Sequence, residues 1–190
     1  MQHRTDCKIT IDGNIGSGKT TQLNLLRERL GYTIHKEPIQ DWPLKLFYED
    51  KKRWAFLLQL AILKSFHSER EGSGVWERSP ESSREVFWKM LRGSYTDEED
   101  DVYRYFYESF SWEPDVHVYI RTDPEECFER ISKRHQEGDS KIDVEYLRLV
   151  HEFYEEYIRT KENVRVIDGN KKSSEEIHDE IVRCIRGALA

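Results

Sequence analysis

Short apolar runs alternate with amphipathic segments along this chain. Runs rich in β-branched and apolar residues predict strands at 7–12, 32–37, 117–121 and 164–168, with a further short strand inside 72–79. Helical periodicity occurs at 21–30, 43–70 (two pieces broken near Asp50), 82–91, 97–110, 123–135, 142–159 and 173–189. The alternation predicts an α/β fold, in which a parallel sheet of about five strands carries helices on both faces. We expect one domain, residues 1–190, with ligands at the carboxyl ends of the strands.

The segment GNIGSGKT (13–20) matches the P-loop pattern and lies between a predicted strand and a predicted helix. Its glycines allow backbone N–H groups to converge on phosphate oxygens, while Lys19 can reach the β- and γ-phosphates and the Thr20 hydroxyl can bind Mg²⁺. We therefore expect ATP, or another nucleoside triphosphate donor, and Mg²⁺ as cofactors. The expected phosphate-binding residues are Gly13, Asn14, Ile15, Gly16, Ser17, Gly18, Lys19, Thr20 and Thr21. The P-loop leaves open whether the nucleotide is hydrolysed or donates phosphate to a small molecule.

The composition of the chain limits the classes of binding partner that we expect. Of 190 residues, 30 are Lys or Arg and 37 are Asp or Glu, so the net charge is −7. Such a chain has no general attraction for nucleic acid or an anionic membrane, and we predict neither as a partner. Cys7, Cys127 and Cys184 lack zinc-site spacing and are expected to be buried, reduced thiols, and the histidines are expected at the surface. Without an apolar signal segment or a run long enough to span a bilayer, we expect a cytoplasmic protein.

Three segments after the P-loop belong together: HKEPIQDW (35–42), RWAFLLQ (53–59) and WERSPESSREVF (76–87). The ordered set GNIGSGKTT, EP-x-x-x-W, W-A-x-x-x-Q and ERS with an Arg five residues on resembles the P-loop deoxynucleoside kinases. That family includes thymidine, deoxycytidine and deoxyguanosine kinases. The resemblance runs from about Ile9 to Tyr157. It implies a P-loop kinase fold and ATP-dependent phosphorylation of the 5′-hydroxyl of a deoxyribonucleoside.

The resemblance assigns the catalytic residues. Glu37 corresponds to the general base that takes the proton of the 5′-hydroxyl, a role in which a carboxylate activates a weak alcohol nucleophile. Arg78 corresponds to the arginine that holds the 5′-oxygen and the transferring phosphoryl group, and Glu77 would support Mg²⁺ beside Thr20. The alternatives are a turn carboxylate at Glu37 and a surface ion pair at Glu77 and Arg78.

The resemblance also assigns a nucleoside pocket. Gln59 would read the base, and because an amide offers a donor and an acceptor side by side, it fits thymine or cytosine without choosing between them. Phe87 would stack on the base and Tyr48 would bind the sugar 3′-hydroxyl. Ser83 stands where deoxycytidine and deoxyguanosine kinases carry Asp; it leaves room for the thymine methyl group, so we expect thymidine and also deoxycytidine as substrates. The remaining expected wall residues, each of which taken singly is ordinary core, are Trp42, Leu58, Ile62, Phe66 and Leu91.

Two further expectations rest on the resemblance. The segment at about 130–141 matches the lid, where Arg130 and Arg134 would neutralise charge on the transferring group; the alternative is an exposed charged helix end. The lid acid that meets the 3′-hydroxyl is Asp139 or Glu137, and we favour Asp139. Relatives commonly dimerise through helices near the aromatic-rich segment 102–112, so a homodimer is expected.

Two other functions compete with a nucleoside kinase. A thymidylate kinase shares the P-loop, the Glu-Pro and a lid, but it tends to follow Glu-Pro with Gly-Gly, whereas this chain has PIQDW after Glu37. A non-catalytic P-loop regulatory protein is the alternative of another class. It is disfavoured because no NKxD base-reading motif of the GTPases is present.

Overall fold

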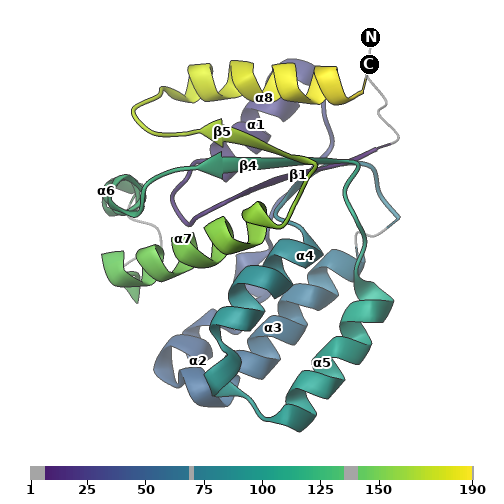
Figure 1. Cartoon of the computed structure of the whole chain (residues 1–190), viewed down its shortest axis with the longest axis vertical. Coiled ribbons are helices and arrows are strands. Elements are labelled where there is room, and N and C mark those ends of the chain that lie inside the picture. Colours follow the sequence, from purple (N-terminus) through teal and green to yellow (C-terminus); the bar gives the residue numbers. More distant parts are fainter. Residues whose placement is uncertain (1–6, 69–70, 135–140, 190) are drawn as a thin grey trace.

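The computed structural model describes residues 7–68, 71–134 and 141–189, which form a five-stranded parallel sheet with helices on both faces (Figure 1). The strands are β1 Lys8–Gly13, β2 Ile34–His35, β3 Gly74–Glu77, β4 Val116–Arg121 and β5 Val164–Asp168. The α-helices are α1 Lys19–Leu30, α2 Leu44–Glu49, α3 Lys51–Ser68, α4 Pro80–Ser82, α5 Asp97–Phe110, α6 Pro124–Arg134, α7 Val144–Arg159 and α8 Ser174–Ala188. The 3₁₀ turns are η1 Ile39–Asp41 and η3 Arg92–Ser94, and η2 Ser83–Trp88 is a π-helical turn. The predicted fold class is confirmed.

The strand order is β2-β3-β1-β4-β5, with every pairing parallel. β1 is therefore central: Ile11 lies opposite Glu77 of β3, and Gly13 lies opposite Ile120 of β4. The chain leaves β1 toward β2 and β3 on one side and later returns to β4 and β5 on the other. This switch point places the carboxyl ends of β1, β2 and β3 side by side, where an open α/β sheet binds ligands.

Two apolar clusters cover the two faces of the sheet. α1 and α8 lie on one face, and the cluster there joins these helices to β1, β3, β4 and β5 (Figure 1). On the other face α7 and η2 pack against β4, around Tyr119, Tyr154 and Tyr157. Strands buried on both sides read as almost continuous apolar runs, which explains why β1 and β4 were visible in the sequence.

A third apolar cluster lies among the helices beneath the sheet rather than against it. It joins α2, α3, the end of η2 and α5, with Phe47, Leu58, Trp88 and Tyr103 at its centre (Figure 1). Trp88 stacks between Tyr95 and Tyr103, with ring centroids 3.7 Å apart in both pairs. We call this group of helices the helical layer.

The structure corrects several expectations. The strand predicted at 32–37 is only Ile34–His35, because pairing stops short of Pro38, which has no N–H to donate to a ladder. The helix break near Asp50 is confirmed. His117 and His178 are buried, not at the surface as expected. Of the three thiols only Cys127 is fully buried. Within the described ranges, no helix has both the length and the apolarity needed to cross a bilayer.

Candidate active site

The P-loop connects β1 to α1, and at two of its glycines there is no room for a side chain. A Cβ on Gly13 would lie 2.6 Å from Ser17 Oγ, and one on Gly16 would lie 2.6 Å from the carbonyl oxygen of Cys127. Both have positive φ, 152° and 83°. α1 begins at Lys19 with no side-chain cap and no acidic residue in its first turn. Its free N–H groups are thus available to an anion.

Lys19 is buried at the start of α1, 5% exposed, and its Nζ donates to the carbonyl oxygen of Asn14 at 2.9 Å. Burial, followed by repulsion from Arg78, lowers the pKa of Lys19 to about 8. The Lys19 ammonium therefore loses its proton at a lower pH than an exposed lysine does.

Thr20 and Glu77 form an oxygen-rich pair between α1 and the end of β3. The Thr20 hydroxyl lies 2.9 Å and 3.1 Å from the two carboxylate oxygens of Glu77. Mg²⁺ in nucleotide sites binds one or two protein oxygens and completes its shell with phosphate and water. A hydroxyl and a carboxylate beside the P-loop fit that requirement. Within the described residues no group of three His, Cys, Asp or Glu side chains is placed to hold a metal by protein ligands alone.

Glu37 and Arg78 meet at the carboxyl ends of β2 and β3. The Arg78 guanidinium donates to Glu37 Oε2 in an ion pair whose side chains are 7% and 13% exposed. Burial raises the pKa of Glu37 above its ordinary value, opposed by the charges of Arg78 and Lys19. A carboxylate with a raised pKa is a better proton acceptor than an exposed one. This geometry excludes the solvated turn carboxylate and the surface ion pair as alternatives.

Arg78 also reaches the P-loop. Its Nη2 lies 3.4 Å from the carbonyl oxygen of Gly13, and its guanidinium lies over the Phe87 ring at 4.8 Å. The Arg78 backbone has φ 67°, a left-handed conformation that costs about 1–2 kcal/mol for a residue with a side chain. Such strain is commonly found at active sites. Arg78 thus joins the acceptor carboxylate to the phosphate loop.

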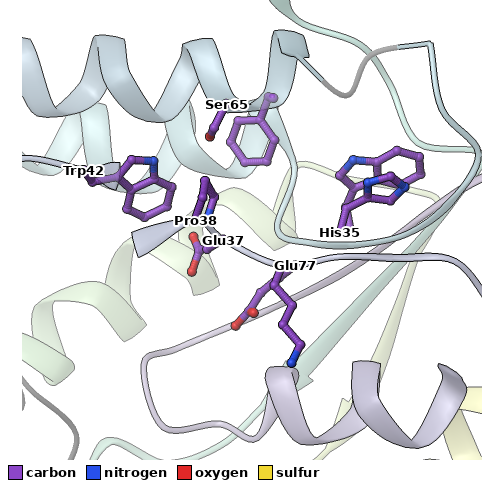
Figure 2. Close-up of a pocket in the computed structure, with 9 residues that line it drawn as sticks. His35, Glu37, Pro38, Trp42, Ser65 and Glu77 are labelled. Carbon is purple, nitrogen blue, oxygen red and sulfur yellow. The ribbon is translucent and has the colours of Figure 1, made fainter. Parts of the chain in front are cut away.

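A small pocket opens beside this pair (Figure 2). Among the predicted site residues, Glu37, Trp42, Phe66 and Glu77 line it. Figure 2 shows the carboxylates of Glu37 and Glu77 on the side away from His35, whose ring stacks on Trp76 at a centroid distance of 4.1 Å. The other lining residues are Lys36, Pro38 and Ser65.

The other predicted nucleoside contacts lie in the helical layer and at η2. Gln59 on α3 is 2% exposed, and its Oε1 has no hydrogen-bond partner among the described residues. A buried amide oxygen without a donor is costly, so this atom is suited to a ligand N–H. Trp42, Tyr48 and Ile62 pack against the same cluster as buried Leu58. Ser83 is buried and Phe87 half-buried on η2.

The structure describes the lid segment only as far as Arg134 and again from Lys141. Arg130 on α6 donates to the carbonyl oxygens of Ser17 in the P-loop at 3.3 Å and of Gly169 at 2.8 Å, and pairs with Glu126. Arg134 is exposed at the end of α6. Asp139 and Glu137 fall outside the described residues, so the choice between them stays a prediction.

Three buried residues near Arg78 were not predicted as part of the site. They are Asp12 on β1, His117 on β4 and Tyr154 on α7. Each lies in an apolar run or on an apolar helix face, and Asp12 is 105 residues from His117 and 142 residues from Tyr154 in the sequence. The available signal in the sequence was Asp12, a charged residue in the predicted strand directly before Gly13. A buried carboxylate requires a hydrogen-bond partner, so Asp12 indicated that polar groups lie nearby.

Comparison with known proteins identifies the family. The deoxynucleoside kinase family model matches residues 9–189. The chain belongs to the deoxynucleoside kinase family. It is 37% identical over 172 residues to a putative kinase protein of Invertebrate iridescent virus 3, covering 86% of this chain and 88% of that protein. It is 34% identical over 169 residues to the mitochondrial thymidine kinase 2 of Homo sapiens, covering 79% of this chain and 63% of that protein.

Family membership makes this protein a phosphotransferase. A deoxyadenosine/deoxycytidine kinase of Bacillus subtilis is 30% identical over 164 residues, covering 79% of this chain and 76% of that protein. The fold is that of the deoxyadenosine kinase from M. mycoides with bound dCTP: the TM-score is 0.83 at 23% identity, covering 95% of this chain and 99% of that one. The names of the relatives differ in the nucleoside. Membership in the family therefore shows the class of reaction, whereas the choice of nucleoside has to be argued from the residues of the pocket.

Proposed function

We propose that this deoxynucleoside kinase transfers the γ-phosphoryl group of ATP to the 5′-hydroxyl of thymidine and of deoxycytidine. The observation that carries the proposal is Arg78, whose guanidinium contacts both the Glu37 carboxylate and the Gly13 carbonyl oxygen of the P-loop. An alcohol oxygen placed against Glu37 is then adjacent to the phosphate site. This is the arrangement that transfer between a bound triphosphate and a hydroxyl requires.

Each group has a definite task in this transfer. Glu37 accepts the proton of the 5′-hydroxyl as its oxygen attacks. Arg78, which has donors left over after its contacts with Glu37 and Gly13, stabilises the charge that spreads over the transferring phosphoryl group. Lys19 and the N-terminus of α1 hold the donor phosphates, and Arg130 and Arg134 approach from the lid side. Thr20 and Glu77 would hold Mg²⁺, which would neutralise the negative charge of the phosphate groups.

The pocket supports a pyrimidine nucleoside. Gln59 offers a buried amide oxygen that has no partner within the described part of the chain. This oxygen can accept from N3–H of thymine or, with the amide turned, from the exocyclic amine of cytosine. The Phe87 ring would stack on the base, Trp42, Leu58, Ile62 and Phe66 would enclose it, and Tyr48 and Asp139 would bind the sugar 3′-hydroxyl. Ser83 places no carboxylate near the 5-position of the base.

Thymidylate kinase is the competing activity. Its acceptor is a phosphate dianion, which the buried Glu37 carboxylate would repel unless Arg78 alone compensated for it. Arg78 is already paired with Glu37, so a neutral hydroxyl fits this site better. The non-catalytic alternative is set aside by family membership.

The test is a panel of the four deoxynucleosides and thymidylate, with ATP and Mg²⁺, for wild type, Glu37→Gln and a control, Glu113→Gln. Glu113 is exposed and remote from the site, on the loop before β4. We expect thymidine and deoxycytidine to be phosphorylated, with kcat of Glu37→Gln about 10²–10⁴-fold lower because the base is lost. The control should match wild type.

Three outcomes would contradict the proposal. Phosphorylation of thymidylate but of no nucleoside would establish the competing activity. Equal kcat in wild type and Glu37→Gln would remove Glu37 as the base. Deoxyguanosine phosphorylated faster than thymidine would show that the pocket has been misassigned.

The homodimer and the cytoplasmic location remain proposals made by resemblance and composition. α5 exposes Val102 and Tyr105, at 43% and 68%, which suits a subunit contact. Sedimentation analysis of the purified protein measures the oligomeric state directly.

A further inference from the structure

A chain of buried polar groups extends from Arg78 into the interior of the sheet. Arg78 Nε donates to the Tyr154 hydroxyl at 3.0 Å, the Tyr154 hydroxyl lies 3.4 Å from Asp12 Oδ1, and Asp12 Oδ2 lies 2.8 Å from His117 Nε2. Asp12 and Tyr154 are completely buried, and His117 is 7% exposed. None of the three is required to bind phosphate or nucleoside in the function proposed above.

The direction of these hydrogen bonds follows from the groups themselves. Arg78 Nε can only donate, so the Tyr154 oxygen must accept from it. The Tyr154 proton is then free to point at Asp12, which as a carboxylate only accepts. Burial raises the pKa of the Tyr154 hydroxyl, which therefore keeps the proton it donates. His117 satisfies the second oxygen of Asp12, so the carboxylate is fixed from both sides.

The Tyr154 ring is also held in place. It stacks on Tyr119 with centroids 5.3 Å apart, and its edge meets the Phe87 ring at 6.2 Å. Phe87 in turn lies under the Arg78 guanidinium. Tyr154 therefore accepts from Arg78 Nε through its hydroxyl, and its ring contacts the Phe87 ring on which the guanidinium rests. A guanidinium fixed at Nε can rotate less, so its remaining N–H groups keep one direction.

We infer that Tyr154, oriented by Asp12 and His117, is a positioning residue that fixes the Arg78 guanidinium toward the transferring phosphoryl group. The inference rests on the proposed role of Arg78 in phosphoryl transfer. Tyr154 touches neither substrate; it acts through Arg78. Its loss should therefore lower kcat while leaving the KM for the nucleoside nearly unchanged, because the interaction it supports strengthens in the transition state.

A double-mutant cycle separates this role from general stabilisation. The variants are Tyr154→Phe, Arg78→Lys and the pair combined. Tyr154→Phe keeps the stacked ring and removes only the hydroxyl, and we expect kcat about tenfold lower, since a hydrogen bond to a charged group is lost. Lysine has no Nε–H to donate to Tyr154, so in the Arg78→Lys background the second substitution should change kcat by less than about twofold.

Tyr119→Phe is the matched control. Tyr119 belongs to the same aromatic stack, but its hydroxyl donates to Glu155 at 3.2 Å, away from Arg78. We expect its kcat to stay within about twofold of wild type. Thermal unfolding of every variant checks that the kinetic comparison is made on folded protein.

The outcomes are distinct. Unchanged kcat in Tyr154→Phe, or an equal fold-loss in the wild-type and Arg78→Lys backgrounds, overturns the inference and leaves the proposed function standing. Wild-type protein without activity on any deoxynucleoside overturns both. Should Tyr154→Phe not fold, 3,5-difluorotyrosine placed at position 154 keeps the hydroxyl but makes its oxygen a poorer acceptor. A lower kcat would then support the inference, and an unchanged kcat would overturn it.

Discussion

At the scale of single residues, the site combines groups whose charges depend on one another. Lys19, Glu37 and Arg78 lie close enough for each to shift the pKa of another, and all three are largely buried. Burial and the positive charge of Arg78 disfavour the Lys19 ammonium more than the charges of Glu77 and Glu37 favour it, so the pKa of Lys19 is lowered to about 8. A triphosphate beside it would reverse that balance, because negative charge favours the ammonium form.

ATP binding should therefore take up a proton near pH 8. Below its pKa of about 8, Lys19 is already charged and contributes fully; as pH rises through that value the free protein loses the charge, and ATP affinity should fall. Titration calorimetry at pH 8 in buffers of different ionisation enthalpy measures the uptake. Lys19→Arg, which stays charged, should take up none. Equal ATP affinity at pH 7 and pH 9 in the wild type would contradict the expectation.

The site residues that the sequence predicts are those that stand in short, contiguous motifs. The P-loop lies in eight consecutive positions, and Glu37 and Arg78 each stand in a short motif, so the sequence predicts them. Asp12, His117 and Tyr154 have no such pattern. A buried Tyr in an amphipathic helix is ordinarily core, and only the parallel sheet brings β1, β4 and α7 together around Arg78.

At the scale of elements, the ends of helices fix the site more than their middles. Ser79 caps α4: its side chain accepts from Ser82 N–H at 3.0 Å, and the Ser82 hydroxyl accepts from Ser79 N–H at 3.1 Å. This reciprocal cap follows directly on Arg78 and its left-handed backbone. Thr96 and Glu99 form an equivalent cap at the start of α5, remote from the P-loop.

Removing the two caps should separate stability from activity. Ser79→Ala and Thr96→Ala should each lower the free energy of unfolding by about 1 kcal/mol, measured by urea denaturation. Only Ser79→Ala should also lower kcat, because the backbone that presents Arg78 loses its anchor. Similar kcat losses in both variants would show that the α4 cap has no special part in the site.

The order of the elements could be predicted from periodicity, but their local geometry could not. A helix over 82–91 was expected, and the structure instead begins it at Pro80 and continues with a π-helical turn at Ser83–Trp88. A π-helical turn contains one more residue than an α-helical turn. This changes the spacing of apolar residues too little to be detected in a segment of ten residues such as 82–91. The turn nevertheless sets where Ser83 and Phe87 lie, so the contacts proposed for them with the base rest on a feature that patterning does not reveal.

At the scale of the whole molecule, the phosphate site and the proposed base pocket rest on different cores. The P-loop and Lys19 are supported by the sheet cluster of β1, β4, α1 and α8. Trp42, Tyr48 and Leu58 belong to the helical layer. Glu37 and Arg78 lie at the junction, between the ends of β2 and β3.

This division predicts the effect of Ser83→Asp. A carboxylate at that position would accept from the amine of cytosine and would crowd the methyl group of thymine. We expect the ratio of kcat/KM for thymidine over deoxycytidine to fall by about tenfold or more, while the KM for ATP stays unchanged. Ser83→Ala, which adds no charge, should keep the wild-type ratio. An unaltered ratio in Ser83→Asp would place this residue away from the base.

The separate helical layer has a consequence for how such enzymes diversify. Side chains in one packed cluster can be exchanged together when total volume is kept, and such exchanges need not disturb a cluster elsewhere. A lineage can thus repack α2 and α3 around a new base while inheriting its phosphate chemistry intact. Relatives named for thymidine and for deoxyadenosine or deoxycytidine share this family with the present chain. Libraries that aim to change its nucleoside are therefore best confined to α2 and α3, since Phe87 on η2 also contacts the Arg78 guanidinium.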